Sequence, residues 1–252
     1  MDYGLKNKNV LITGSTKGLG KAIARVLAEE GANVVISGRS QIEATTLAEE
    51  IKAENKVQAI GIAANLMEKG AAEALFEESV GRLGRIDILV NNAAIWPTSF
   101  VADMEKTEFE KTIYLNLEVP YILSRMMVKH LLERKEKGKI VHIVSQAAFH
   151  GSTTGHAHYA SAKAGLVTFM ISQAREVAKY GININAVAPG IMKTDMMLQQ
   201  LREKENYYKE RIPLGRVADP EEVAYAVAYL ASNKADYLTG ITIDATGGML
   251  MR

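Results

Sequence analysis

A glycine-rich loop between two short apolar runs restricts the fold of this chain more than any other feature of its sequence. Residues 10–12 form the first apolar run, Gly14, Gly18 and Gly20 follow it, and residues 34–36 form the second run. The stretch between the loop and the second run repeats its apolar residues at helical spacing. A strand, a loop, a helix and a strand within about 30 residues are typical of a βαβ unit with parallel strands.

The glycine loop itself suits a phosphate. A helix N-terminus carries unpaired N–H groups and the positive end of the helix dipole, and both favour an anion. The spacing here is G-x3-G-x-G, whereas the usual dinucleotide fingerprint is G-x-G-x-x-G. The loop therefore predicts a phosphate site, and a tight turn that binds no ligand is the alternative.

The alternation of apolar runs and amphipathic stretches continues along the whole chain. Buried strands are expected at residues 10–12, 34–36, 57–61, 86–90, 140–144, 182–187 and 241–244. Helices are expected over a stretch ending at Gly31, over residues 42–52, 68–83, 107–136 and 220–231, and from about residue 158. No repeat, linker or low-complexity tract interrupts this order. The sequence therefore predicts an α/β fold, a single-domain doubly wound (Rossmann) parallel sheet of about seven strands with helices on both faces, spanning residues 1–252.

Charge and composition exclude several classes of function. The net charge is +1, so no strong attraction to nucleic acid or to a membrane surface is implied. The chain has no cysteine, which excludes disulfides, thiol catalysis and Cys-ligated zinc, and we predict no metal site. No apolar stretch approaches the ~18 residues of a membrane-spanning helix, and the N-terminus does not read as a signal peptide. A cytoplasmic protein is the expectation.

Tyr159 and Lys163 stand four residues apart in a stretch with helical periodicity. Positions i and i+4 lie on the same face of a helix, so both side chains should point into one volume. A tyrosine normally has a pKa of about 10, and a neighbouring positive charge lowers it. The pair therefore predicts a proton donor or acceptor tuned toward neutral pH, whereas two unrelated surface residues are the alternative reading.

Two cations near the glycine loop bear on the choice of dinucleotide. An NAD site places an acidic residue at the end of the second strand to hold the ribose hydroxyls. Gly38 occupies that place here, whereas Lys17 lies in the loop and Arg39 follows the strand. Cations in these positions favour the 2′-phosphate of NADP. The alternative is that both are ordinary surface charges.

The set of motifs, in this order and spacing, resembles the short-chain dehydrogenase/reductase family over essentially the full length of the chain. The matching positions are Thr13, Gly14, Gly18, Gly20, Asn91, Asn92, Ala93, Ala94, Asn116, Ser145, Tyr159, Lys163, Pro189, Gly190 and Thr194. The resemblance implies an NAD(P)-dependent oxidoreductase. It implies that Asn116, Ser145, Tyr159 and Lys163 are the catalytic residues, with Asn116 anchoring a water that connects Lys163 to solvent.

The resemblance also implies the set of residues that bind NADP(H). These are Gly14, Ser15, Thr16, Lys17, Gly18, Leu19, Gly20, Arg39, Asn65, Leu66, Asn92, Ala93, Ala94, Tyr159, Lys163, Pro189, Gly190 and Thr194. Two positions depart from the family pattern. Ala94 stands where glycine is usual, and Asn65 stands where an aspartate usually meets the adenine. Either change is expected to weaken cofactor binding slightly.

The segment of residues 192–211 is expected to form a substrate lid. It carries Met196, Met197 and other apolar residues, and methionines adapt to irregular apolar ligands. A helix that packs its apolar face on the core is the alternative. Trp96, Phe149 and the nearby histidines are further residues that could line the substrate pocket.

Three functions are compatible with these features. The first is a general NADPH-dependent reductase of small carbonyl compounds, or dehydrogenase of the matching alcohols. The second is a 3-oxoacyl-acyl-carrier-protein reductase, because residues 213–224 resemble that branch of the family, and Lys129 and Arg175 fall where the branch keeps basic residues for its acidic carrier protein. The third is a nucleotide-sensing regulator without catalysis, which is disfavoured because all four catalytic positions are present. The resemblance implies a homotetramer that packs through the helices near residues 107–136 and 158–179 and the C-terminal strand.

Overall fold

The computed structural model of the protein describes residues 2–195 and 197–251. Its centre is one seven-stranded parallel sheet with the order β3-β2-β1-β4-β5-β6-β7. The strands are β1 (Asn9–Ile12), β2 (Asn33–Gly38), β3 (Ala59–Ala63), β4 (Ile88–Asn91), β5 (Gly138–Ile143), β6 (Ile182–Pro189) and β7 (Thr242–Ala245). The strand order reverses at β1, which pairs with both β2 and β4. In doubly wound sheets this reversal opens a crevice outside the carboxyl ends of the strands.

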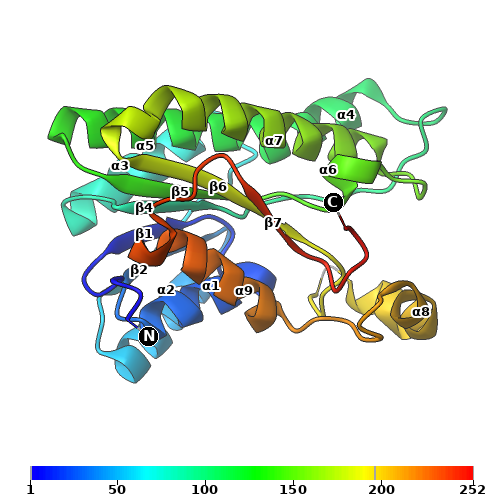
Figure 1. The fold of residues 1–252 in the computed structure, drawn as a ribbon, viewed down its shortest axis with the longest axis horizontal. Helices are drawn as coiled ribbons and strands as arrows, with labels where there is room; N and C mark the ends of the chain where they lie inside the picture. The colour runs from blue at the N-terminus through cyan, green and yellow to red at the C-terminus, as the bar shows by residue number, and fades with distance from the viewer. Residues whose placement is uncertain (1, 196, 252) are drawn as a thin grey trace.

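Helices cover both faces of the sheet (Figure 1). The α-helices are α1 (Gly18–Glu29), α2 (Gln41–Asn55), α3 (Ala71–Leu83), α4 (Lys106–Ile113), α5 (Val119–Arg134), α6 (Ala147–His150), α7 (Ala157–Val177), α8 (Leu198–Arg211) and α9 (Pro220–Ala231). Helices α1, α2 and α9 pack on one face, and α3, α5 and α7 pack on the other (Figure 1). The predicted fold class is confirmed.

The hydrophobic core is divided into two large clusters by the sheet. Leu27 of α1 and Val227 of α9 belong to the first cluster, and Leu123 of α5 and Leu166 of α7 belong to the second. The strands β1 and β4 are buried along their whole length. Continuous apolar runs, without alternation, follow from this burial on both faces.

The helix expected over residues 107–136 is interrupted by one π-helical turn, Tyr114–Glu118, which separates α4 from α5. Pro120 explains the turn, because proline has no N–H and cannot donate to the carbonyl of Asn116 four residues earlier. The side chain of Asn116 donates instead to the carbonyls of Thr112 and Ile95, at 3.0 Å each. Such π-turns are often found at functional sites.

Other differences from the sequence-based expectation concern short elements and boundaries. The short helix α6, which follows Ser145, was not expected. Strand β3 begins at Ala59 and not at residue 57, and β4 begins at Ile88 and not at residue 86. Apolar residues that flank a strand are buried as well, for example Ile86, so hydrophobicity alone does not fix where pairing begins.

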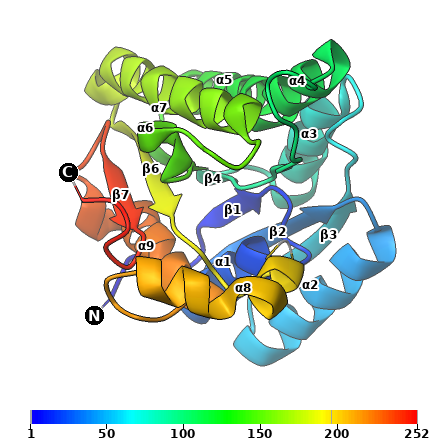
Figure 2. The ribbon, with the colours of Figure 1, turned by 90° about the vertical axis from the view of Figure 1, so that its right-hand side faces the viewer.

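Helix α8 lies outside the carboxyl ends of the strands, across from α6 (Figure 2). It contributes to a small third cluster, whose buried members are Leu201, Ile212 and Val217. Lys204 interrupts it with non-helical dihedral angles. Met196, part of the expected lid, lies outside the described residues, and the role of residues 192–211 as a lid stays a prediction.

No helix in the described parts of the chain is long and apolar enough to cross a membrane.

Candidate active site

One large cleft opens at the carboxyl ends of the strands, with a volume of about 1570 Å³. Pockets for one small ligand usually measure about 300–1,000 Å³. The cleft therefore has room for two ligands side by side. The predicted site residues that line it are Gly14, Thr16, Lys17, Gly18, Leu19, Gly20, Arg39, Asn65, Leu66, Asn92, Ala93, Ala94, Ser145, Tyr159, Pro189, Gly190 and Thr194.

Ser15 belongs to the predicted set, but its polar groups are used within the fold. Its hydroxyl donates to the carbonyl of Ile12 at 2.8 Å and accepts from the N–H of Ser37 at 2.9 Å. Its own N–H donates to the carbonyl of Ser37 at 2.7 Å. The side chain is fully buried. Ser15 thus joins the start of the loop to β2, and neither its hydroxyl nor its N–H is free for a ligand.

The glycine loop is compact because Gly20 has no side chain. A Cβ atom at this position would collide with the carbonyl oxygen of Gly14 and would lie 2.7 Å from both Ser15 Cα and Asn92 Nδ2. Gly14 and Gly18 have φ angles of +62° and +54°, a region that other residues rarely adopt. The three glycines therefore let the loop pack tightly, and the N-terminus of α1 lines the cleft.

Replacing Gly20 with alanine should displace the loop, because backbone atoms of Gly14 and Ser15 must move to admit the methyl group. We expect a loss of stability of roughly 1–3 kcal/mol, typical of overpacking, together with a larger loss of dinucleotide affinity. Urea unfolding and a cofactor titration measure the two effects. Gly81→Ala is the control, because a Cβ there meets nothing within 4 Å. Equal behaviour of the two variants would contradict the role given to Gly20.

Asn92 and Thr13 lock the glycine loop to β4. Asn92 Nδ2 donates to the carbonyls of Thr13 and Gly14 at 2.9 and 3.0 Å. Thr13 Oγ1 accepts from the N–H groups of Asn92 and Ala93, at 2.9 Å each. Asn92 lines the cleft, but its amide supports the loop. Sequence reasoning used Thr13 only as part of a motif and missed this function.

Lys17 and Arg39 both line the cleft and are exposed. Neither forms an ion pair with a residue of the described chain. The residues next to these cations, Thr16 and Gly38, are in close contact, which the sequence did not reveal. A Cβ at Gly38 would lie 2.5 Å from Thr16 Cγ2 and 2.8 Å from Thr16 Oγ1. Thr16 therefore occupies the space that an acidic side chain at position 38 would need. Asn65 lines the cleft nearby, and its Nδ2 donates to Glu68 at 2.8 Å.

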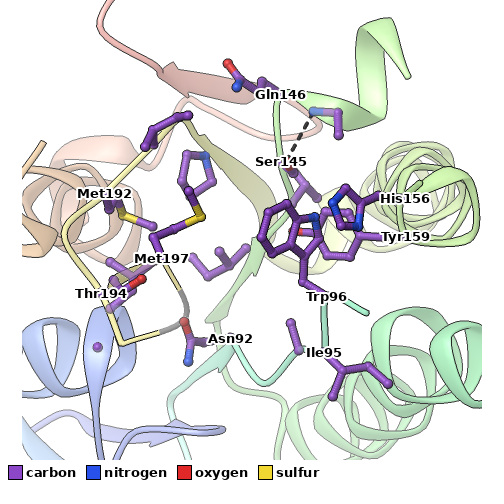
Figure 3. Close-up of a pocket in the computed structure, with 18 of the residues that line it drawn as sticks. Asn92, Ile95, Trp96, Ser145, Gln146, His156, Tyr159, Met192, Thr194 and Met197 are labelled. Atoms are coloured by element: carbon purple, nitrogen blue, oxygen red, sulfur yellow. Dashed lines mark hydrogen bonds between the residues drawn. The ribbon is translucent and has the colours of Figure 1, made fainter. Parts of the chain in front are cut away.

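Ser145 and Tyr159 come together from two elements. Ser145 follows β5, and its hydroxyl accepts from the N–H of Ala147 at 3.2 Å (Figure 3). Tyr159 stands in the first turn of α7 and is half-buried in the cleft wall. Burial raises the pKa of Tyr159 to about 12, and hydrogen bonding with Ser145 acts in the opposite direction. The phenol is therefore protonated at neutral pH.

Lys163 is buried, with 2 % of its surface exposed, and does not line the cleft. Its Nζ donates to the carbonyl of Ile143 at 2.8 Å and lies 5.7 Å from the centroid of the Tyr159 ring. Burial lowers its pKa to about 7. The expectation that Lys163 brings the pKa of Tyr159 toward neutrality is not met in this arrangement, because burial raises the pKa of the phenol and the ammonium is directed at the Ile143 carbonyl of β5.

The buried Lys163 should make stability depend on pH. Between pH 7 and the ordinary lysine pKa of about 10.4, the unfolded chain binds a proton that the folded chain does not, so this group makes stability rise with pH. At pH 6 we expect the free energy of unfolding of Lys163→Met to exceed that of wild type. The difference should be several kcal/mol at most, because each unit by which burial lowers the pKa of Lys163 corresponds to about 1.4 kcal/mol. The lost hydrogen bond to Ile143 offsets about 1 kcal/mol.

The difference between Lys163→Met and wild type should shrink from pH 6 to pH 9. Tyr159 does not interfere, because its raised pKa lies above this range. Urea unfolding of the protein without added cofactor at both pH values measures the effect. A difference that is constant with pH would contradict the assigned burial of a charge.

Asn116 is fully buried in the π-turn and does not line the cleft. Its Oδ1 atom and the Oγ1 atom of Thr112 are buried without a hydrogen-bond partner in the described chain. Buried polar atoms nearly always have a partner, often an ordered water. A water at this place, which the family resemblance implies, could form hydrogen bonds with both oxygens.

The C-terminal segment contributes to the cleft, which sequence reasoning missed. Met249, Leu250 and Met251 line it after the chain turns at Gly247 and Gly248. Gln146 Nε2 lies 3.8 Å from the sulfur of Met249. Gly247 and Gly248 indicated a turn in the sequence, but nothing in the sequence indicated that the chain after this turn runs toward the cleft.

The arrangement fits a dinucleotide with a neighbouring substrate. The helix N-terminus and the cations Lys17 and Arg39 suit phosphates, and the size of the cleft exceeds the need of one small molecule. The described residues contain no group of three or more side chains that could hold a metal ion.

Comparisons with known proteins agree with this geometry. Residues 14–250 match a family model described as enoyl-(acyl carrier protein) reductase. The chain is 39 % identical over 249 residues to the 3-oxoacyl-(acyl-carrier-protein) reductase FabG of Aquifex aeolicus, covering 99 % of this chain and 100 % of the relative. It is 37 % identical to the reductases of the same name from Vibrio cholerae, covering 98 % and 99 %, and Escherichia coli, covering 98 % of both.

A crystal structure of a short-chain type dehydrogenase/reductase from Mycobacterium marinum superimposes with a TM-score of 0.93 and 29 % identity, covering 100 % of this chain and 98 % of the other. The fold, the cleft and the full-length matches agree, and the protein belongs to the short-chain dehydrogenase/reductase family of oxidoreductases.

Proposed function

We propose that this protein is an NADPH-dependent 3-oxoacyl-(acyl-carrier-protein) reductase. The sequence placed a general carbonyl reductase first and this function second. The full-length similarity to proteins named as 3-oxoacyl reductases now favours the second. The observation that carries the proposal is this similarity joined to a cleft in which Ser145 and Tyr159 share one wall.

Reduction of a ketone needs a hydride on carbon and a proton on oxygen. The nicotinamide cofactor, when bound, supplies the hydride. Ser145 would donate a hydrogen bond to the ketone oxygen and stabilise its developing negative charge. Tyr159 would give its proton to the same oxygen, and the pKa of about 12 keeps the phenol loaded with that proton at neutral pH. In the oxidising direction the same residue would accept the proton.

Lys163 and Asn116, which are buried and do not line the cleft, would support this proton transfer. Lys163 would lie close enough to Tyr159 to compensate the phenolate left after the transfer, since a nearby cation favours the charged form. Asn116 would hold a water that returns a proton from solvent, and the unpartnered oxygens of Asn116 and Thr112 support such a water. The residues that would hold the cofactor are those of the predicted set that line the cleft, with Lys17 and Arg39 at the 2′-phosphate.

An acidic carrier protein would dock on cations outside the cleft. Lys129 on α5 and Arg175 on α7 are exposed and form no ion pair within the described chain. Arg175 follows Tyr159 by sixteen residues on the same helical run, which corresponds to about 24 Å along the helix axis. A carrier that holds its substrate on a long flexible arm can bridge such a separation, whereas a free ketone would not depend on these cations.

The decisive experiment compares three substrates with NADPH: an acetoacetyl carrier-protein thioester, a crotonyl carrier-protein thioester and a panel of free ketones. We expect micromolar KM only for the acetoacetyl thioester. Preference for the crotonyl thioester would point to enoyl reduction. Saturating activity on free ketones alone would return the general carbonyl reductase to first place, and no activity with any substrate would favour a regulatory role.

Charge reversal at the docking cations should separate carrier recognition from chemistry. In Lys129→Glu with Arg175→Glu, we expect KM for the acetoacetyl carrier-protein thioester to rise at least tenfold, because electrostatic complementarity is lost. The kcat/KM for a free 3-oxoester should be unchanged. Lys52→Glu with Lys234→Glu, two exposed cations elsewhere, is the matched control. Equal effects of both double variants on the carrier substrate would contradict specific docking.

The proposed assembly is a homotetramer. Large apolar side chains are exposed on the outer helices, among them Phe109 on α4, Tyr121 on α5 and Tyr225 on α9. Tyr121 meets Phe169 of α7 with ring centroids 5.8 Å apart, so part of this surface is continuous between helices. Light scattering in solution tests the proposal, and a monomer would rule it out.

A further inference from the structure

Trp96 and His156 form a flat aromatic plate beside Tyr159. Their ring centroids lie 4.0 Å apart and the planes meet at 23°. Both residues line the cleft. Figure 3 shows them on the side of Tyr159, with Met192 and Met197 on the opposite side of the opening. The two sides of this opening therefore differ in chemistry.

The aromatic plate is fixed by backbone contacts between two loops. His156 Nδ1 donates to the carbonyl of Pro97 at 2.8 Å, and the N–H of Ser99 donates to the carbonyl of Gly155 at 2.7 Å. His156 also occupies the N-cap position of α7, three residues before Tyr159, and its carbonyl accepts from the N–H of Ala160 at 2.9 Å. The plate therefore keeps a constant position relative to the phenol.

The plate is uncharged at neutral pH. Burial lowers the pKa of His156, the Pro97 carbonyl raises it, and His158 lowers it further. The opposite side is different, because it carries two methionines: Met197 packs against the small cluster of Leu201, Ile212 and Val217, and Met192 packs against the first large core cluster. Methionine side chains adapt to irregular groups. One side of the opening is thus rigid and planar, and the other is adaptable.

We infer that the aromatic plate selects carbonyl substrates in which a planar group, such as an aryl ring, is conjugated directly to the reacting carbonyl. This inference rests on the proposed function, since it requires the carbonyl at Ser145 and Tyr159. The ring stacks on Trp96, and the flexible remainder of the substrate lies along the methionine side. Aromatic stacking of this kind corresponds to a preference of roughly two- to tenfold.

Trp96 is the single tryptophan of the chain, so its fluorescence reports binding directly. The probes are ethyl benzoylacetate, an aryl 3-oxoester, and ethyl 3-oxohexanoate, its alkyl counterpart. With NADP⁺ present there is no hydride donor, and we expect saturable quenching at lower concentration of the aryl ester. Equal concentration dependence for both esters would overturn the inference.

Turnover with NADPH gives the second measurement. The ratio of kcat/KM for the aryl over the alkyl ester should fall at least threefold in Trp96→Leu and stay near the wild-type value in Trp96→Phe. An unchanged ratio in Trp96→Leu overturns the inference and leaves the proposed function intact. A wild-type protein that reduces no 3-oxo substrate contradicts the proposed function instead. Should Trp96→Leu fail to fold, the quenching of wild type by the two esters still decides.

Discussion

Replacing Tyr159 with phenylalanine is expected to lower kcat by about 10²–10⁴-fold, the usual contribution of a positioned general acid. The variant loses only the hydroxyl, so packing in the wall of the cleft is kept. In the proposed mechanism Ser145 would still polarise the substrate oxygen, but no group at position 159 could deliver the proton. The affinity for NADPH should change little, because in the proposed site the glycine loop and its cations hold the phosphates.

Steady-state kinetics with an acetoacetyl thioester and a separate NADPH titration measure the two properties. Tyr180→Phe is the matched control, because Tyr180 is exposed just beyond the end of α7 and should leave both unchanged. Near-normal turnover of Tyr159→Phe would remove the assigned proton donor. A parallel loss of cofactor affinity would show instead that the hydroxyl serves mainly in binding.

The architecture was predictable because central strands such as β1 and β4 are buried along their whole length. The run of residues 10–12 reads as continuous hydrophobicity for this reason, and the glycine loop after it marks the turn into α1. The π-turn at Asn116 was not predictable from hydrophobic periodicity, which is nearly the same for a π-turn and an α-helical turn. Pro120 was the available signal, since a proline four residues after a buried asparagine removes one helical hydrogen bond.

Which residues line the cleft was more predictable than the interactions that each of their side chains forms. Parallel strands bring their carboxyl ends to one edge, so Arg39, Ser145 and Pro189 had to converge. Hydrogen-bond partners depend on distances of a few tenths of an ångström, which the order of residues does not contain. Ser15 and Asn92 therefore fall at the expected place but hold the fold together, and the pKa of Tyr159 moves opposite to the expectation because burial was not foreseen.

Thr16 adds a steric reason to the electrostatic one for the proposed preference for NADPH. An acidic side chain at position 38 would hydrogen-bond the ribose hydroxyls of NAD and repel a 2′-phosphate. Gly38 removes the repulsion, and Thr16 fills the space next to it. Lys17 and Arg39 then face the cleft without a carboxylate partner in the described chain, so their charges are available for an anion.

Removing both cations, in Lys17→Ala with Arg39→Ala, is expected to reduce the preference for NADPH over NADH by more than tenfold in kcat/KM. Hydrogen bonds to a charged partner contribute roughly 1.5–3 kcal/mol each, and a tenfold change corresponds to about 1.4 kcal/mol. Only NADPH carries the 2′-phosphate, so the loss should fall on NADPH alone while kcat/KM for NADH stays close to wild type. Lys52→Ala with Lys234→Ala is the control for a general change in surface charge. If both coenzymes lose activity equally, the cations act on the shared pyrophosphate. If neither does, the discrimination comes from Thr16 and Gly38.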